Sequence, residues 1–483
     1  MIAKARGKHF SFTDKKPYLK SGWRNYGGLW LGKVSSLATR LAGTGGSTLP
    51  GRLASPVTPS LLPHLAAQIG LGNLVITGSN GKTTCAALLA DMAGRCGLKL
   101  VHNSSGANLL WGVASTYISA ASWQGKLNRD LAVIEADEAA FPGIVNALAP
   151  RCVIVTNLFS DQLDRLGGIE KTREFIQKGL RLLPAGSVVL LNADDPAVAS
   201  LEAGSNQTVL HYGLDLEPPP DKAEPVKACP YCRQRLGYSK AYFSHLGHYY
   251  CLGCRFSRPE PEYKIIGTGR GKDLIISAPG QKYELRFSLP GTYNLYNALA
   301  AWAGSCVLGL PANTALAGLS EALPTFGRME KLKVCGREVI MALIKNSAGA
   351  DQVLQSILKL PGPLSLLIAI NDREVDGADV SWLWEVNFEQ LAASRNMFIR
   401  IVISGTRAAD TALRLKYAGL PVSGLLIKRR LHEGLLAGLG DPSSSETLVI
   451  LPSYTAMLEL RNILGWISKG GDLRKGALYY GKQ

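Results

Sequence analysis

The chain has 483 residues, of which 46% are hydrophobic and 19% charged, a composition typical of a globular protein with two or three domains. No run of about 18 apolar residues occurs, which excludes a bilayer-spanning helix. The basic N-terminus, with Lys4, Arg6 and Lys8, lacks the apolar stretch and cleavage site of a secretory signal. We therefore expect a cytoplasmic protein.

The formal net charge of +16 favours an acidic partner: nucleic acid, an anionic membrane face or a phosphorylated substrate. The alternative is a solvated basic surface that binds no particular partner, which would give the same net charge. Nucleic acid is the least favoured partner, because basic and aromatic residues do not interleave as on a single-strand binding platform. The nine cysteines are too few for a disulfide-dense protein and suit a reducing compartment.

Residues 1–50 form a basic N-terminal arm. Within it, apolar side chains recur at helical spacing at Trp30, Leu31, Val34, Leu37 and Leu41. The spacing predicts a short helix. It either packs on the main domain, the interpretation we favour, or touches a membrane surface.

Residues 51–325 are expected to form an α/β central domain with a parallel sheet. Continuous aliphatic or β-branched runs, each followed by a polar or turn residue, predict buried strands at Leu74–Thr77, Leu131–Glu135, Cys152–Asn157 and Val188–Asn192. Helices are predicted over Cys85–Arg95, Ile169–Leu183 and Asn294–Leu308. Because ligands bind at the carboxyl edge of such sheets, we expect the functional groups there.

A second, Rossmann-like α/β domain is expected over residues 326–483, beyond a turn at Leu323–Gly327. Strand-like runs recur there at Val339–Ile344, Leu364–Ile370, Ile399–Ser404 and Thr447–Leu451. The central domain also carries an insertion over residues 225–260. Strand-like alternation resumes after it, at Asp273–Ser277 and Tyr283–Ser288.

The strongest motif is a glycine-rich loop between a predicted strand and a predicted helix, with the residues Gly78, Ser79, Asn80, Gly81, Lys82, Thr83 and Thr84. Glycines let the backbone N–H groups turn toward phosphate oxygens, and the helix start adds its positive dipole end. Lys82 is expected to reach the β- and γ-phosphates of ATP, and the Thr83 hydroxyl to bind Mg²⁺. In the common eight-residue phosphate-loop motif a glycine lies five residues before the second glycine, but here that position is Ile76. The shorter G-x-x-G-K-T-T motif that remains is typical of a narrower group of families.

Acidic residues end the next predicted strand. Glu135 is expected to be the second Mg²⁺ ligand and to act with Lys82 in catalysis, because a neighbouring parallel strand ends beside the phosphate loop. Asp137 and Glu138 are candidates for water-mediated support. The alternative is a solvated cluster of strand-end carboxylates.

The insertion contains two C-x-x-C pairs separated by 18 residues, Cys229 with Cys232 and Cys251 with Cys254. Four thiolates at this spacing predict a closed, structural Zn²⁺ site, which would stabilise a ribbon too short for a core of its own. We expect His245 and His248, within the ribbon, to be exposed polar residues rather than ligands.

Four weaker motifs follow the loop in order, at Thr156–Arg165, Leu191–Pro196, Gly291–Asn297 and Phe326–Glu330. Together with the loop they resemble the signatures of the Mur ligases of peptidoglycan synthesis, over residues 50–480. The resemblance implies ATP bound at the central domain, an acyl phosphate intermediate and a C-terminal domain that closes over the site. It also implies that Asn294 and Asn297 lie near the adenine and that Arg328 reaches the ATP phosphates.

The chain departs from most Mur ligases at Gln162, where a metal-binding histidine is usual, and it has no room for a full nucleotide-sugar-binding N-terminal domain. The segments Lys345–Ala350 and Asn371–Trp382 resemble the MurT subfamily, the synthetase subunits of lipid II isoglutaminyl synthase, which Gln162 also matches. Lys178 is either carbamylated to bind metal, as in several Mur ligases, or an ordinary surface lysine.

The MurT resemblance implies that ATP phosphorylates the α-carboxyl of D-isoglutamate in the lipid II stem peptide, and that ammonia displaces the phosphate to give D-isoglutamine. The ammonia would come from a GatD-type glutamine amidotransferase subunit. The sequence agrees, because no recognisable glutaminase context surrounds Cys85, Cys96, Cys152, Cys306 and Cys335.

Asp379, and after it Asp376, are expected to act across the subunit interface by orienting a histidine of the partner's Cys–His pair. An acidic loop that merely shapes the ammonia path is the alternative. Because lipid II carries a pyrophosphate at the membrane face, the basic charge predicts peripheral association with the inner face of the membrane.

Two other functions compete. A folylpolyglutamate-type or Mur-type amino-acid ligase would fit the short N-terminal region, but the ribbon and the Asn371–Trp382 segment argue against it. A nucleic-acid-binding ATPase would fit the zinc ribbon and the charge. Its phosphate loop, however, would follow the nucleic-acid motor pattern, from which this loop departs.

Overall fold

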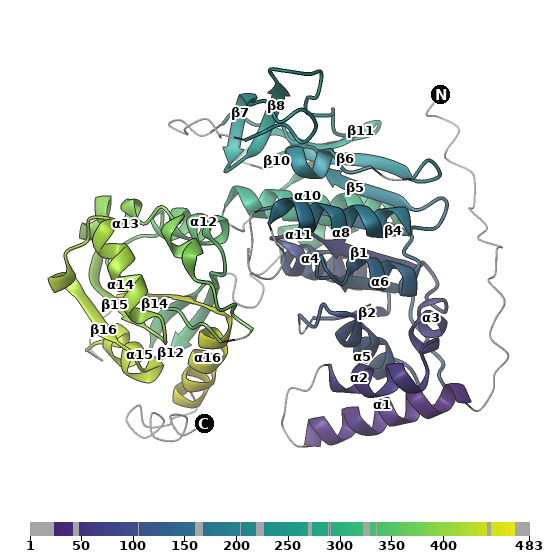
Figure 1. Ribbon diagram of the computed structural model, residues 1–483, viewed down its shortest axis with the longest axis horizontal. Coiled ribbons are helices and arrows are strands. Elements are labelled where there is room, and N and C mark those ends of the chain that lie inside the picture. The colour runs from purple at the N-terminus through teal and green to yellow at the C-terminus, as the bar shows by residue number, and fades with distance from the viewer. Residues whose placement is uncertain are drawn as a thin grey trace.

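The computed structural model describes residues 24–41, 48–104, 106–159, 168–202, 204–218, 227–268, 273–287, 289, 291–321, 329–334, 336–373, 375–441 and 446–468. Within these residues, no helix combines the length and the apolar character needed to cross a bilayer. Two α/β units lie side by side, and a two-stranded ribbon projects from the first (Figure 1). The ribbon consists of β7 (Leu236–Phe243) and β8 (Leu246–Cys251).

The first unit is built on a nine-stranded sheet with the order β11-β10-β9-β6-β5-β4-β1-β3-β2. Its strands are β1 (Asn73–Thr77), β2 (Leu100–His102), β3 (Leu131–Glu135), β4 (Cys152–Val155), β5 (Val188–Asn192), β6 (Thr208–Leu214), β9 (Tyr263–Thr268), β10 (Leu274–Ala278) and β11 (Gln281–Leu285). In the order of the sheet, all strands from β9 across to β2 are parallel to one another. At the other edge, β10 pairs antiparallel with both β9 and β11. The predicted α/β class is therefore confirmed.

Helices cover both faces of this sheet, because alternate strand residues point to opposite sides. Leu74 and Ile76 pack into one core with α4 (Lys82–Arg95), α10 (Thr292–Val307) and α11 (Ala312–Ser320). Val75 packs into the other core, whose helices are α3 (Leu61–Ala66), α5 (Leu110–Ala120), α6 (Phe141–Leu148) and α8 (Ile169–Arg181). Burial on both faces explains why these strands read as unbroken apolar runs.

The predicted N-terminal helix exists as α1 (Arg24–Leu41), which packs on α2 (Leu49–Val57) and α5. The large apolar residues that define its spacing do not make this contact. Trp30, Leu31, Val34 and Leu37 are exposed, whereas Leu29 is buried.

The second unit has a six-stranded sheet with the order β12-β13-β17-β14-β15-β16, parallel except for the pair β12–β13. Its strands are β12 (Glu330–Val334), β13 (Arg337–Met341), β14 (Leu364–Ala369), β15 (Phe398–Ser404), β16 (Leu425–Lys428) and β17 (Thr447–Pro452). Its helices are α12 (Ser347–Ile357), α13 (Glu389–Ala393), α14 (Ala408–Tyr417), α15 (Leu431–Leu439) and α16 (Tyr454–Ser468), with short 3-10 turns at Ser381–Trp384, Arg395–Met397 and Val422–Gly424.

Strand β4 ends at Val155, two residues before the predicted end of the strand. The reason lies in the polar residues that follow. Thr156 still donates its backbone N–H to the Thr77 carbonyl, but the side chains of Thr156 and Asn157 bond to Asn80 in the glycine-rich loop. The end of one strand thereby fixes the loop that follows its neighbour β1.

Candidate active site

The glycine-rich loop joins β1 to the first turn of α4, as its sequence predicts. Gly78 and Gly81 have φ angles of +121° and +86°, a region that disfavours other residues. A Cβ atom on Gly81 would collide with the side chain of Asn297, and one on Gly78 would collide with Thr156. Both glycines are therefore required by conformation and by the close approach of neighbouring elements.

Asn80 is held from two sides. Its N–H donates to Asn157 Oδ1 at 2.9 Å, and its carbonyl accepts from Thr156 Oγ1 at 2.8 Å and from Asn157 Nδ2 at 3.0 Å. Across the cleft, Asn346 Nδ2 in the second unit donates to Asn80 Oδ1 at 3.2 Å. The loop is thus held in place by the end of the neighbouring strand and by the second unit.

Lys82 is buried, and its ammonium lies inside the curve of the loop. It donates to the carbonyls of Gly78 and Ser79 and forms an ion pair with Glu138 Oε1 at 2.9 Å. Burial alone would lower the pKa of Lys82, but the charges of Glu138 and Glu135 outweigh it and raise the pKa above its usual value. The ammonium therefore remains charged. Sequence spacing does not predict the pairing with Glu138, because it is the turn after β3 that brings this carboxylate within reach of Lys82.

Glu135 ends β3 beside the loop. Its Oε2 accepts from Thr83 Oγ1 at 2.8 Å and its Oε1 from Asn108 Nδ2 at 3.2 Å, while Asn103 bonds to its backbone. A hydroxyl and a carboxylate this close, at the edge of a polar cleft, are hard oxygen donors of the kind that Mg²⁺ prefers. The two residues therefore fit the magnesium site expected from the sequence.

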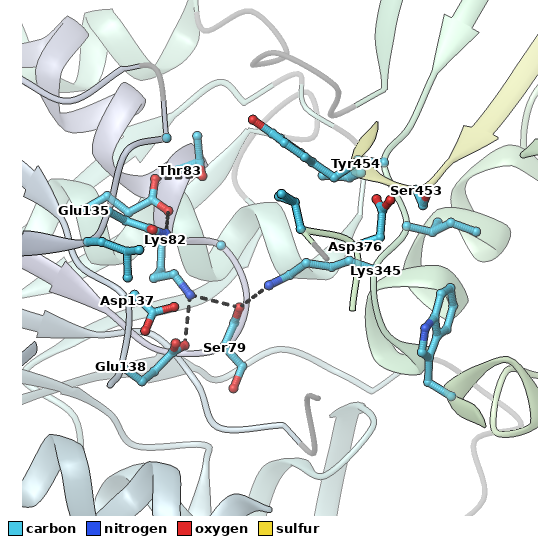
Figure 2. Close-up of a pocket in the computed structure, with 18 of the residues that line it drawn as sticks. Ser79, Lys82, Thr83, Glu135, Asp137, Glu138, Lys345, Asp376, Ser453 and Tyr454 are labelled. Carbon is cyan, nitrogen blue, oxygen red and sulfur yellow. Dashed lines mark hydrogen bonds and ion pairs between the residues drawn. The ribbon is translucent and has the colours of Figure 1, made fainter. Parts of the chain in front are cut away.

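The loop opens into a cleft of about 330 Å³ between the two units (Figure 2). The first unit lines it with Ser79, Lys82, Thr83, Glu135, Asp137 and Glu138, and the second with Lys345, Asn371, Asp376, Trp382, Ser453 and Tyr454. Lys345 reaches across and donates to the Ser79 carbonyl at 3.4 Å. One wall thus offers groups of the kind that suit phosphate and Mg²⁺, and the other offers a lysine and a carboxylate.

The two carboxylates expected at the subunit interface have different surroundings. Asp376 lines the cleft, and both of its oxygens accept from Thr455, one from the backbone N–H at 2.8 Å and one from the hydroxyl. Asp379 is half-exposed outside the cleft lining, and it accepts from the backbone N–H and the hydroxyl of Ser381 at 2.7 and 2.8 Å. The structure therefore does not bring Asp379 to the phosphate loop.

The other predicted residues have separate positions. Asn294 and Asn297 are buried on α10, and Asn297 lines a second, small cavity together with Gly81 and Tyr296. Lys178 is exposed on α8 and lines a different groove, away from the cleft, so the alternative of an ordinary surface lysine fits it. Arg328, Gln162 and Cys335 lie outside the described residues.

The four cysteines of the ribbon converge around β7 (Leu236–Phe243) and β8 (Leu246–Cys251). All four Sγ atoms lie within 4.8 Å of one another, with Cys229 and Cys254 3.7 Å apart and Cys232 and Cys251 3.3 Å apart. Tetrahedral Zn–S bonds of about 2.3 Å require Sγ atoms about 3.8 Å apart, whereas a disulfide requires about 2 Å. The thiols fit a structural Zn²⁺ site.

The tip of the ribbon reaches the active site, which corrects one expectation. His245 is buried, not exposed; its Nε2 lies 3.3 Å from Asp195 Oδ2, and its ring packs edge-on against Phe159. Phe159 N–H in turn donates to Ser79 Oγ at 3.0 Å. His248 is half-buried, with its Nε2 2.8 Å from the Leu214 carbonyl. Neither histidine belongs to the cysteine cluster.

Loss of zinc should therefore affect the nucleotide loop as well as the ribbon. We expect Cys232→Ser to abolish bound zinc, to lower the melting temperature by about 5 °C or more, and to weaken nucleotide binding. Metal analysis, calorimetry and nucleotide titration check these three effects. Cys96→Ser, at a half-buried thiol outside the ribbon, is the matched control, and equal zinc content in both variants would refute the site.

The described thiols outside the ribbon are poor nucleophiles. Burial raises the pKa of the Cys85 and Cys96 thiols. It also raises the pKa of Cys152 to about 12 and the pKa of Cys306 to about 11. Because the thiolate is the nucleophilic form, these residues do not suit a glutaminase reaction.

Comparisons with known proteins agree with this site. The family model of the Mur ligase middle domain matches residues 76–225, and that of the MurT ligase C-terminal domain matches residues 343–457. The chain is similar in fold to a pseudomurein peptide ligase type C from Methanothermus fervidus, with a TM-score of 0.61, 23% identity, and coverage of 82% of this chain and 79% of that one.

Two curated relatives cover nearly the whole chain. The MurT subunit of lipid II isoglutaminyl synthase (glutamine-hydrolyzing) from Streptococcus pneumoniae is 33% identical over 446 residues, 90% of this chain and 96% of the relative. The corresponding subunit from Staphylococcus aureus is 31% identical over 452 residues, 93% of this chain and 100% of the relative. Mur ligases use ATP and Mg²⁺, for which the loop and Glu135 have suitable groups. The chain therefore belongs to the MurT family of Mur-ligase-type enzymes in peptidoglycan biosynthesis.

Proposed function

We propose that this chain is the synthetase subunit that converts D-isoglutamate of the lipid II stem peptide into D-isoglutamine, with ATP as the activating substrate. The observation that carries the proposal is the cleft itself. It sets Lys82, Thr83 and Glu135 opposite Lys345 and Asp376. The names of the two MurT relatives supply the substrate class.

In the first step, the backbone N–H groups of the loop and the Lys82 ammonium hold the β- and γ-phosphates of ATP. Thr83 and Glu135 would hold Mg²⁺, which when bound neutralises the phosphate charge that develops. A carboxylate oxygen of the substrate attacks the γ-phosphorus, forms a new P–O bond and displaces ADP. Lys345, which already reaches Ser79, is placed to stabilise the anionic acyl phosphate.

In the second step, the lone pair of ammonia attacks the acyl carbon, and the C–O bond to phosphate breaks. The nitrogen loses one proton, which leaves with the phosphate as hydrogen phosphate, so the product is a neutral amide. Closure of the cleft would exclude water, which would otherwise hydrolyse the acyl phosphate.

We further propose that ammonia comes from a GatD-type glutamine amidotransferase bound to the second unit. Both relatives are named as subunits of a glutamine-hydrolysing enzyme. The described thiols outside the ribbon have raised pKa values, which supports an external source of ammonia.

Asp379 is the better of the two interface candidates, because it lies outside the lining of the cleft, whereas Asp376 lines the cleft beside the phosphate loop. We expect Asp379→Asn to lower glutamine-dependent amidation by the complex about a hundredfold or more, and to leave ammonium-dependent amidation unchanged. Asp372→Asn, at a carboxylate in the same segment that pairs with Arg407, is the control. Normal glutamine turnover in the Asp379 variant would show that Asp379 does not assist the glutaminase reaction of the partner.

The proposed reaction is tested by mass spectrometry of lipid II after incubation with the chain, ATP, Mg²⁺ and ammonium chloride. We expect a product in which one hydroxyl is replaced by an amino group. A product enlarged by an added amino acid, formed only when free amino acids are supplied, would instead favour the amino-acid ligase.

A further inference from the structure

Helix α1 presents its large apolar side chains to solvent. Trp30, Leu31, Val34 and Leu37 are 53%, 40%, 57% and 54% exposed. At 3.6 residues per turn these four positions fall within roughly a third of the helix circumference. We call this stripe the outer face of α1. Figure 1 shows α1 as the outermost helix of the first unit, at the end opposite the ribbon.

The opposite face of α1 packs through small residues. A Cβ atom on Gly28 would lie 2.6 Å from Thr58 Oγ1, and one on Gly32 would lie 3.0 Å from Ile118 Cγ2. Ser35 is also buried on this face. A surface helix of a globular protein ordinarily turns its large apolar residues inward and its polar residues outward. Here the arrangement is reversed, which leaves a contiguous apolar stripe that folding does not use.

The loop between α5 and β3 extends the stripe. Trp123, 51% exposed, lies beside Trp30, whose indole N–H donates to the Trp123 carbonyl at 3.0 Å. Lys33 anchors α1 to the last turn of α5 and to the start of this loop by donating to the Ser119 and Ala121 carbonyls. Exposed tryptophans beside aliphatic residues are characteristic of surfaces that sit at a membrane–water interface.

The part of the sequence that contains α1 and α2 is basic. Between Asp14 and Asp91 it contains no aspartate or glutamate, but eight lysines and arginines, of which Lys82 lies buried in the active-site loop and not beside the stripe. Exposed Arg52 on α2 and exposed Lys126 in the Trp123 loop belong to the same region. Such a surface is complementary to anionic lipid headgroups, which attract basic segments within a Debye length. A second copy of the chain would bring like charges together.

We infer that the outer face of α1, with Trp123, inserts at the headgroup level of an anionic phospholipid bilayer and docks the enzyme on it. The inference rests on the proposed function, in that lipid II is a membrane-bound substrate. It goes further by naming the surface that makes the contact. The apolar side chains supply insertion, and the surrounding basic residues supply attraction.

The test is co-sedimentation of the full-length chain with vesicles of phosphatidylglycerol and phosphatidylethanolamine. We expect the triple variant Leu31→Ser, Val34→Ser, Leu37→Ser to partition about tenfold more weakly than the unmodified chain, because three apolar groups no longer insert. The matched control replaces three exposed apolar residues of the second unit, Leu413→Ser, Val422→Ser and Leu426→Ser, and should bind as the unmodified chain does.

Two further measurements complete the test. Binding should weaken as salt rises and on neutral phosphatidylcholine vesicles. The variant should still amidate detergent-solubilised lipid II, so loss of vesicle binding is distinguishable from failure of the proposed reaction. Equal partitioning of variant and unmodified chain would overturn the inference. So would a concentration-dependent dimer that the variant abolishes, which would assign the face to a second copy.

Discussion

Lys82→Met is expected to lower the rate of ATP-dependent amidation about a thousandfold, the largest effect of any single change that we consider. The ammonium lies inside the curve of the loop, where it bonds to the Gly78 and Ser79 carbonyls. Its loss removes charge stabilisation of the transferring phosphate, an interaction worth about a hundredfold to a thousandfold per donor in comparable sites. Initial rates with ammonium chloride, together with titration of a non-hydrolysable ATP analogue, measure the effect.

Two controls separate a loss of catalysis from misfolding. Lys178→Met removes an exposed lysine on α8 and should leave the rate unchanged. Lys82→Met leaves Glu138 buried without its partner, which is destabilising in itself. The double variant Lys82→Met, Glu138→Gln relieves that penalty and should remain inactive. Activity in the double variant within a few-fold of the unmodified enzyme would contradict the assignment of Lys82.

Glu135→Gln is expected to lower the rate about a hundredfold at a fixed Mg²⁺ concentration and to raise the concentration needed for half-maximal rate. Glutamine keeps the shape of the side chain and can still accept from Thr83, so the cleft should remain intact. The negative charge is lost, and with it the second carboxylate oxygen, which accepts from Asn108 Nδ2. A magnesium titration of the initial rate measures this.

Asp137→Asn is the comparison for Glu135, because Asp137 also lines the cleft but its carboxylate caps the backbone N–H of Ala139. We expect Asp137→Asn to lower the rate and to change its magnesium dependence less than Glu135→Gln does. If the magnesium dependence of the Glu135 variant matched that of the unmodified enzyme, the carboxylate would not be a metal ligand, and the pair Thr83–Glu135 would be structural.

Much of this architecture could be predicted because the signals are local. A run such as Leu74–Thr77, buried on both faces, followed by a glycine-rich loop, predicts a parallel strand and a phosphate site without knowledge of distant contacts. The paired cysteines are likewise informative through spacing alone. The residues that β3 and β4 bring to the loop, Glu135 and Asn157, follow from the rule that parallel strands end at one edge.

The unpredicted features depend on contacts distant in sequence. The pairing of Lys82 with Glu138, the bonds from Asp376 to Thr455 and the burial of His245 against Asp195 join residues separated by about 50 or more positions. Spacing also predicted that α1 is a helix but not which face packs. That was decided by Gly28 and Gly32, whose missing side chains allow the close approach to α2 and α5.

The central claim, that the cleft forms an acyl phosphate, is tested most directly by isotope transfer. Lipid II labelled with heavy oxygen in the α-carboxyl group of D-isoglutamate is incubated with the chain, ATP, Mg²⁺ and ammonium chloride, and the released phosphate is analysed by mass spectrometry. Attack of the carboxylate on the γ-phosphorus predicts one heavy oxygen in each phosphate formed with amide. Unlabelled phosphate accompanying full amidation would contradict the mechanism.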